Sequence, residues 1–371
     1  MKKEFLPPQQ GEYILYGADI SLYSGKLRCY LKKKGIPYQE KASTYTCYKH
    51  FIVPRTGVRF IPVLQTAEDQ VWQDSTEIID RLEPVFTVNP AVPQTPKQQV
   101  AAHLIEMYAD QWLLKTALYS RWYASKTSLK EIWTGFGQLL FPRYPQFLQR
   151  FIGKKISGKF RGFMPGLGIN PQTYDAIEQH TDRLTSELDT HFSNHDFILG
   201  GIPSVADYAL IGVFYAQLYR DLDSGQKLKN SAPNVVKWVE RMISDEIPSG
   251  EYLINDEVPD SLDWIFKAIT QQQVPVMIDT AEALHQWQGE HQAQEVPRIL
   301  HEHGFEIEGV KSTRKIIGHA QYMMQRPLAA HKNHQQDQSL KDWVEKKNLH
   351  EFLSYEIQSP IKRQDNRFVF I

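Results

Sequence analysis

The sequence has little cysteine and almost no net charge. Its 371 residues include only two cysteines, Cys29 and Cys47, and these have neither metal-ligand nor Cys-x-x-Cys spacing. That scarcity argues against a disulfide framework and a dithiol redox site, and it indicates a reducing compartment. The formal net charge of −1 provides no global field that would favour nucleic acid or an acidic membrane surface.

Long hydrophobic runs are also missing. The most apolar stretch, residues 208–218, is too short to span a bilayer. Residues 1–8 lack the apolar core of a signal peptide. We therefore expect a cytoplasmic protein without a membrane partner. The histidines at 301–303 and 331–334 are typical of solvated side chains, so we also expect no metal site.

The first 84 residues alternate between strand and helix signals. The predicted elements, in chain order, are a strand at 13–16, a helix at 25–34, a strand at 38–45, strands at 60–64 and 71–73, and a helix at 75–82. Residues 47–56, which include Pro54 and precede Gly57, predict no regular helix. The order β-α-β followed by β-β-α predicts a small α/β sheet with helices on its faces.

The remaining chain is predominantly helical. Four prolines between residues 84 and 96 predict a linker. We therefore divide the chain into an α/β domain at 1–84, a linker at 85–96, an all-helical domain at 97–250 and a mostly helical extension at 251–371. The helices predicted in the extension lie at 261–271, 279–288, 312–325 and 338–347.

Four separated pieces of the sequence, in this order, resemble the glutathione S-transferase family. They are Leu15-Tyr16-Gly17 followed by Ser21 through Arg28, Ile61-Pro62-Val63-Leu64, Asp74-Ser75-Thr76-Glu77-Ile78-Ile79, and Phe197-Ile198-Leu199-Gly200-Gly201 leading to Ser204-Val205-Ala206-Asp207. The first piece resembles the serine-type classes. The match covers about residues 13–245, and the segment after 250 is similar to a longer bacterial subgroup with a helical C-terminal extension.

The resemblance implies both a fold and an activity. The fold would be a thioredoxin-like α/β domain joined to an all-α domain, in a protein that commonly forms a homodimer. The activity would be conjugation of glutathione, as co-substrate, to a small hydrophobic electrophile. No metal is implied.

Ser21 is the predicted catalytic residue. A free thiol has a pKa of roughly 8.5, and a hydrogen-bond donor or a helix N-terminus beside the sulfur favours the thiolate. A serine at the entry to the first helix can supply both effects. The alternatives are that Ser21 is a simple helix N-cap, or that Tyr23 or Ser24 is the thiolate donor.

The other predicted glutathione contacts follow from the resemblance. Asp74 would pair with the ammonium of the γ-glutamyl end, and Ser75 would hold its carboxylate at a helix N-terminus. The backbone of Ile61, before a cis Pro62, would bind the cysteinyl part. Arg59 is a candidate for the glycyl carboxylate. The alternative for Asp74 and Ser75 is that they only stabilise the start of a helix.

The electrophile site is expected between the two domains. Tyr23, Tyr108 and Trp112 are candidates for its wall, although an aromatic stripe at helical spacing is more often core than pocket. Ser204 and Asp207 have the spacing of a helix capping box, so we predict a structural role for them.

A non-catalytic binding or scaffold protein on the same fold is the alternative function, because fold does not fix function. The long extension favours this alternative, since it could cover the site or recruit a partner. A glutathione-dependent reductase is disfavoured because the start of the first helix has no cysteine.

Overall fold

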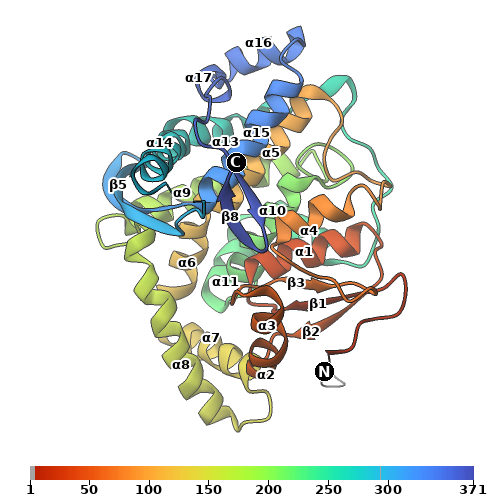
Figure 1. The fold of residues 1–371 in the computed structure, drawn as a ribbon, viewed down its shortest axis with the longest axis vertical. Helices are drawn as coiled ribbons and strands as arrows, with labels where there is room; N and C mark the ends of the chain where they lie inside the picture. Colours follow the sequence, from red (N-terminus) through yellow and green to blue (C-terminus); the bar gives the residue numbers. More distant parts are fainter. Residues whose placement is uncertain (1–4, 293) are drawn as a thin grey trace.

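The computed structural model describes residues 5–292 and 294–371, and a four-stranded mixed sheet forms its N-terminal part (Figure 1). The strands are β1 (Tyr13–Gly17), β2 (Tyr38–Ala42), β3 (Val63–Gln65) and β4 (Val71–Gln73), in the spatial order β2-β1-β3-β4. β1 runs parallel to β2 and antiparallel to β3, and β4 is antiparallel to β3. This arrangement is the thioredoxin-like sheet that the family resemblance implies.

The two faces of this sheet bury different side chains. Successive residues of a strand point to opposite faces, so Leu15 and Ile14 face opposite ways. Leu15 packs in the main core with the helices α1 (Leu22–Lys33) and α4 (Ser75–Leu82). Ile14, Tyr16 and Val63 instead pack with Phe51 in a smaller core on the other face.

The prediction of no regular helix over 47–56 is wrong. This stretch is helical in three pieces, α2 (Tyr45–Cys47), a π-helical turn (Tyr48–Ile52) and α3 (Val53–Thr56), and it ends at Gly57 with φ of 74°. Pro54 directly follows the π-helical turn, where the hydrogen bonding has shifted so that Val53 N donates to Tyr48 O, five residues earlier. Burial of Phe51 and Ile52 beneath the sheet stabilises the helix, and local sequence does not reveal this contact.

The all-helical domain begins at Pro96. Its helices are α5 (Pro96–Met107), α6 (Leu114–Trp122), α7 (Lys126–Leu140), α8 (Gln146–Phe163), α9 (Tyr174–Phe192), α10 (Val205–Val213), α11 (Leu222–Ser231) and α12 (Pro233–Ile243). A π-helical turn, Tyr108–Trp112, joins α5 to α6. Every residue of α10 is buried, and this helix packs against α1 and α5, so it ties the two domains together.

A capping box starts α10. Ser204 Oγ accepts a hydrogen bond from Ala206 N at 3.3 Å, and Asp207 Oδ2 accepts one from Ser204 N at 2.9 Å. Asp207 Oδ1 also accepts hydrogen bonds from Ile198 N and the Trp238 indole. These bonds hold the buried helix terminus in place, which is a structural role.

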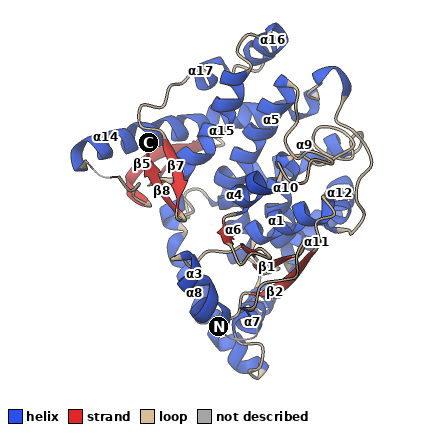
Figure 2. Cartoon of the chain, turned by 45° about the vertical axis from the view of Figure 1, so that its right-hand side comes forward, coloured by secondary structure: helices blue, strands red, loops and turns tan. Residues whose placement is uncertain are grey.

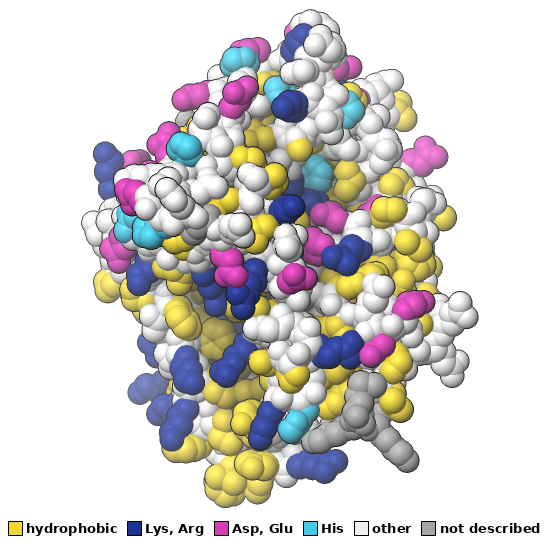
Figure 3. All heavy atoms as spheres, in the orientation of Figure 1, with side chains coloured by type: hydrophobic (Ala, Val, Ile, Leu, Met, Phe, Trp, Pro, Cys, Tyr) yellow, Lys and Arg dark blue, Asp and Glu magenta, His cyan; other side chains and the backbone are white. Residues whose placement is uncertain are grey.

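Helices α7 and α8 form a protruding hairpin. Gly137 and Gly153 face the backbone of the opposite helix so closely that a Cβ at either position would collide with a carbonyl group. Helix α8 carries Lys and Arg but no Asp or Glu. In the space-filling view the lower left, where α8 lies in Figure 1, accordingly shows cationic and apolar side chains together (Figure 3).

The extension contains two β-hairpins in addition to helices. Its elements are α13 (Asp263–Ala268), α14 (Val274–His291), β5 (Ile299–Ile307), β6 (Val310–Ile317), α15 (His319–Asn333), α16 (Gln338–Lys346), α17 (His350–Leu353), β7 (Ile361–Gln364) and β8 (Arg367–Phe370). Figure 2 shows the hairpins as strands lying apart from the four-stranded sheet.

The predicted helix over 312–325 is therefore wrong in its first half. Residues 312–317 belong to β6, in which buried Arg314 and Ile316 alternate with exposed neighbours, the period of a strand. Glu308 and Gly309 join β5 to β6 with φ of 46° and 79°, the signature of a tight hairpin turn. Across the described residues, no helix has both the length and the apolar character needed to cross a membrane.

Candidate active site

Ser21 is the N-cap residue of α1, directly after the turn that follows β1. Its backbone is extended, and its Oγ accepts a hydrogen bond from Ser24 N at 3.3 Å. The side chain is half-buried, and its hydroxyl proton remains available for donation. The N–H groups of the first turn add the positive end of the helix dipole. The position therefore provides the two features that favour a thiolate.

The two rival hydroxyl groups have different surroundings. The Tyr23 hydroxyl donates a hydrogen bond to the backbone oxygen of Asp110 at 3.1 Å. Burial, and then the nearby carboxylates of Asp110 and Asp74, raise the pKa of Tyr23 well above its usual range. Ser24 is fully buried, and within the described residues its Oγ has no hydrogen-bond partner.

The Ile61–Pro62 peptide bond is cis and directly precedes β3. The preceding residues Arg59 and Phe60 are exposed. The guanidinium of Arg298, which lies just before β5 in the extension, sits 4.2 Å from the centroid of the Phe60 ring. The extension therefore reaches this corner of the N-terminal domain.

Asp74 and Ser75 begin helix α4. Asp74 is the N-cap residue, with φ of 86°, and its Oδ1 accepts hydrogen bonds from Thr76 N at 3.0 Å and Glu77 N at 3.3 Å. Ser75 is buried as the first residue of the helix. Both residues thus lie at a helix N-terminus, where backbone N–H groups attract negative charge.

The second carboxylate oxygen of Asp74 is held by the extension. Arg363 Nη1 lies 3.2 Å and His319 Nε2 lies 3.6 Å from Asp74 Oδ2, and Arg363 also donates to Gln73 Oε1. Burial by itself would raise the pKa of Asp74, but His319, Arg363 and Lys26 outweigh it and hold the pKa well below its usual range. Asp74 is therefore an anion whose partners are cationic or hydrogen-bonding groups of its own chain.

Further contacts fix the extension across α4. The Tyr322 hydroxyl donates to Glu77 Oε2 at 3.4 Å, and Arg326 makes a two-pronged ion pair with Asp80 at 2.6 and 2.9 Å. Sequence reasoning missed these contacts, because partners more than 240 positions apart leave no local pattern.

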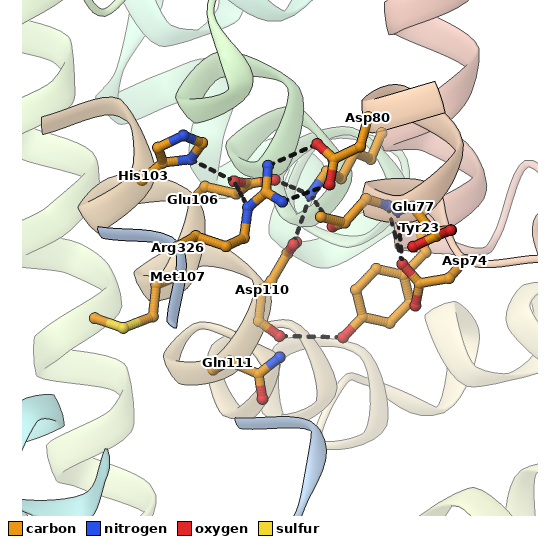
Figure 4. A network of polar contacts seen from close by, with 12 residues as sticks. Tyr23, Asp74, Glu77, Asp80, His103, Glu106, Met107, Asp110, Gln111 and Arg326 are labelled. Carbon is orange, nitrogen blue, oxygen red and sulfur yellow. Dashed lines mark hydrogen bonds and ion pairs between the residues drawn. The ribbon is translucent and has the colours of Figure 1, made fainter. Parts of the chain in front are cut away.

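A buried ionic network lies behind this surface (Figure 4). Lys26 Nζ donates to Thr76 Oγ1 at 2.9 Å, Glu106 Oε1 at 2.9 Å and Asp110 Oδ2 at 2.6 Å. Arg326 Nε donates to Glu106 Oε2 at 2.9 Å. The network joins α1, α4 and α5 to α15 of the extension, so it fixes the orientation of the helices that carry Ser21 and Asp74.

The predicted aromatic wall lies in the core. Tyr108 and Trp112 are fully buried. The Tyr108 hydroxyl is 2.6 Å from His180 Nε2, and Trp112 packs edge-on against Phe305 of β5, with 6.1 Å between the ring centroids. The extension covers the helix face that would otherwise be open. Among the described residues, no group of three or more His, Cys, Asp or Glu side chains could hold a metal ion.

Two family models match the chain, and the first of them covers Ser21 and Asp74. Residues 15–88 match the N-terminal domain of glutathione S-transferases, and residues 156–246 match their C-terminal domain. Over these two domains the chain belongs to the glutathione S-transferase family. The matches exclude the extension, so His319, Arg326 and Arg363 are additions to the transferase domains.

Several solved structures are similar to this transferase-family chain. A β-etherase from Sphingobium sp. strain SYK-6 is 18% identical, with a TM-score of 0.40, over 62% of this chain and 94% of its own. A glutathione S-transferase from Methylobacterium radiotolerans, in complex with glutathione sulfonate, is 19% identical, with a TM-score of 0.38, over 67% and 100%. A glutathione transferase from Phanerochaete chrysosporium is 16% identical, with a TM-score of 0.45, over 64% and 99%. A comparison with proteins of curated function found no match.

Proposed function

We propose that the protein binds glutathione between the start of α1 and the start of α4 and conjugates it, through its thiolate, to a small hydrophobic electrophile. The observation that carries this proposal is the placement of Ser21. It is a half-buried hydroxyl at a helix N-cap, whereas Ser24 is fully buried and Tyr23 is hydrogen-bonded to Asp110. Ser21 would donate a hydrogen bond to the thiolate and so lower the pKa of the glutathione thiol.

The remaining contacts of glutathione would come from three places. The backbone of Ile61 would bind the cysteinyl part, and Arg59 would attract the glycyl carboxylate. Asp74 and Ser75 would hold the ammonium and carboxylate of the γ-glutamyl end, with Asp74 kept anionic by its surroundings. We further expect a homodimer and a cytoplasmic location, as is common in the family.

The test is a conjugation assay with glutathione and a generic aromatic electrophile. We expect Ser21→Ala to lower kcat/KM roughly 10- to 100-fold, the loss of a hydrogen bond to a charged group. Ser21→Thr keeps both the hydroxyl and the helix cap and serves as the matched control. Undiminished turnover in Ser21→Ala would assign the donor to another group.

A non-catalytic binding or scaffold role is the second candidate, and the occupancy of Asp74 by Arg363 favours it. In that case the ammonium site is closed by the chain itself. Retention on immobilised glutathione separates the two candidates. The transferase proposal predicts retention that Asp74→Ala weakens, whereas the scaffold proposal predicts no retention of the wild type.

A further inference from the structure

A small cavity lies between α6 and the β5–β6 hairpin. Its volume is about 10 Å³, which is room for about one water-sized group. Two of the side chains at its wall are cationic and one is an amide, and the others are aliphatic. The lining residues are Gln111, Leu114, Lys115, Leu167, Arg314 and Ile317.

Lys115 is buried without an oxygen partner. Its side chain is 2% exposed, and within residues 5–292 and 294–371 its Nζ makes no hydrogen bond or ion pair. The ammonium instead lies 2.9 Å from the centroid of the Trp112 ring and 5.4 Å from that of Phe305. Aromatic faces attract a cation, but they offset only part of the cost of removing it from water.

Arg314 is the second buried cation at the cavity. It is 4% exposed, and no described residue accepts a hydrogen bond from its Nε or forms an ion pair with it. Burial lowers the pKa of Arg314 to about 10, so it remains charged at neutral pH. Burial, and then the like charge of Arg314, lower the pKa of Lys115 well below its usual range.

The other buried lysine and arginine side chains of the described chain are arranged differently. Each donates to oxygen atoms: Lys26 to Glu106 and Asp110, Lys33 to backbone carbonyls, Arg121 to Asp221, and Lys347 to Asp260 and Asp263. Buried charges are normally paired in this way. The pair at the cavity is therefore the exception, and an anion is the group that would complete it.

We propose that this cavity binds one small monovalent anion between Lys115 Nζ and the Arg314 guanidinium. The shared chemistry is a single anionic atom, either a free halide or one oxygen of a small carboxylate. The aliphatic surroundings of Leu114, Leu167 and Ile317 disfavour a multiply charged phosphate, which needs more hydrogen-bond donors than the cavity offers.

The anion site is connected to the proposed glutathione site. Gln111, at the cavity wall, donates from Nε2 to His319 Nδ1 at 2.7 Å, and His319 Nε2 faces Asp74. Gln111 and His319 therefore form a hydrogen-bonded link between the cavity wall and Asp74. The site itself does not rest on the transferase proposal, because the residues that form it are not those assigned to glutathione.

Thermal unfolding of the full-length protein tests the proposal without glutathione. The protein is dialysed into sodium gluconate as the reference, because the hydroxylated six-carbon chain of gluconate is too bulky to follow its carboxylate into so small a cavity. Chloride or acetate then replaces gluconate at constant ionic strength. We expect chloride, acetate or both to raise Tm saturably by about 2–4 °C. A response to chloride only indicates a halide site, and a response to acetate only indicates a carboxylate site.

Variants assign the response to the cavity. Lys115→Met and Arg314→Met should each abolish the difference between the small anion and gluconate. Lys154→Met is the matched control, because Lys154 also lies over a tryptophan ring, that of Trp133, but on the exposed face of α8. Equal Tm values for the wild type in chloride, acetate and gluconate would overturn the proposal even if Arg314→Met did not fold. An unchanged response in Lys115→Met would also overturn it.

Discussion

Lys26 and Lys115 are two lysines buried to nearly the same extent in one protein, with opposite surroundings. Lys26 meets two carboxylates and a hydroxyl, whereas Lys115 meets two aromatic rings and a second cation. Burial disfavours the charge of both. At Lys26, however, the carboxylates of Asp110 and Glu106 outweigh burial and raise the pKa well above its usual range. At Lys115, burial and Arg314 act together to lower it.

The partners of a buried charge distinguish a structural role from a ligand-binding role. A cation whose partners all come from its own chain fixes helices relative to one another, as Lys26 does between α1, α4 and α5. A buried cation whose only close charge has the same sign has no anionic partner in the chain. Such a group indicates a binding site for an anionic ligand. The contrast between Lys26 and Lys115 leads to three predictions about stability, given from the largest expected effect to the smallest.

The largest loss of unfolding free energy is expected on substitution of Lys26. Lys26→Met leaves Glu106 and Asp110 in the core with one cation fewer, and breaking a buried pair in this way costs about 3–5 kcal/mol of unfolding free energy. Urea unfolding followed by circular dichroism measures the loss. The double variant Lys26→Met with Asp110→Asn should recover part of it, because one uncompensated charge is then removed. A loss below about 1 kcal/mol in the single variant would show that the network is not structural.

Substitution of Lys115 should change the free energy of unfolding much less, and should raise it if it changes it at all. Lys115→Met exchanges an unpaired cation for an apolar side chain of similar length, which is neutral or stabilising when the charge had no partner. In gluconate we expect the free energy of unfolding to change by less than about 1 kcal/mol or to rise. A loss as large as that of Lys26→Met would mean that Lys115 has a partner within the folded chain.

The third prediction is a pH dependence of stability that the comparison with Lys115→Met assigns to Lys115. Because folding lowers its pKa, the unfolded chain binds more protons than the folded chain at pH values between the folded pKa and about 10.4. The stability of the wild type relative to Lys115→Met should therefore rise with pH in that window. Folding raises the pKa of Lys26, so its contribution is full below about pH 10.4 and is lost only at higher pH. Urea unfolding of both proteins in gluconate at pH 7 and about pH 9.5 measures the difference, and parallel pH profiles would refute it.

The N-terminal domain could be predicted from the sequence because its signals are local. Tyr13–Gly17 alternates between the two sheet faces, and the turn before Ser21 introduces a helix with a capping residue. Ser204 and Asp207 stand three residues apart, which is enough to specify a capping box. Where distant residues decided the outcome, prediction failed: the helix at Tyr45–Thr56 forms because Phe51 and Ile52 are buried under the sheet.

By itself, the sequence determined the alternating strand and helix pattern of the N-terminal part and the helical pattern that follows it, since periodicity, caps and turns act over a few residues. The resemblance to glutathione S-transferases added the thioredoxin-like fold and the candidate thiolate donor Ser21. Only the tertiary structure decided which groups surround Asp74 and Lys115. Arg363 and Arg314 reach these side chains from the extension, and burial and charge depend on which distant segments pack together, so the same residue type became a partnered ion at Lys26 and an unpartnered one at Lys115.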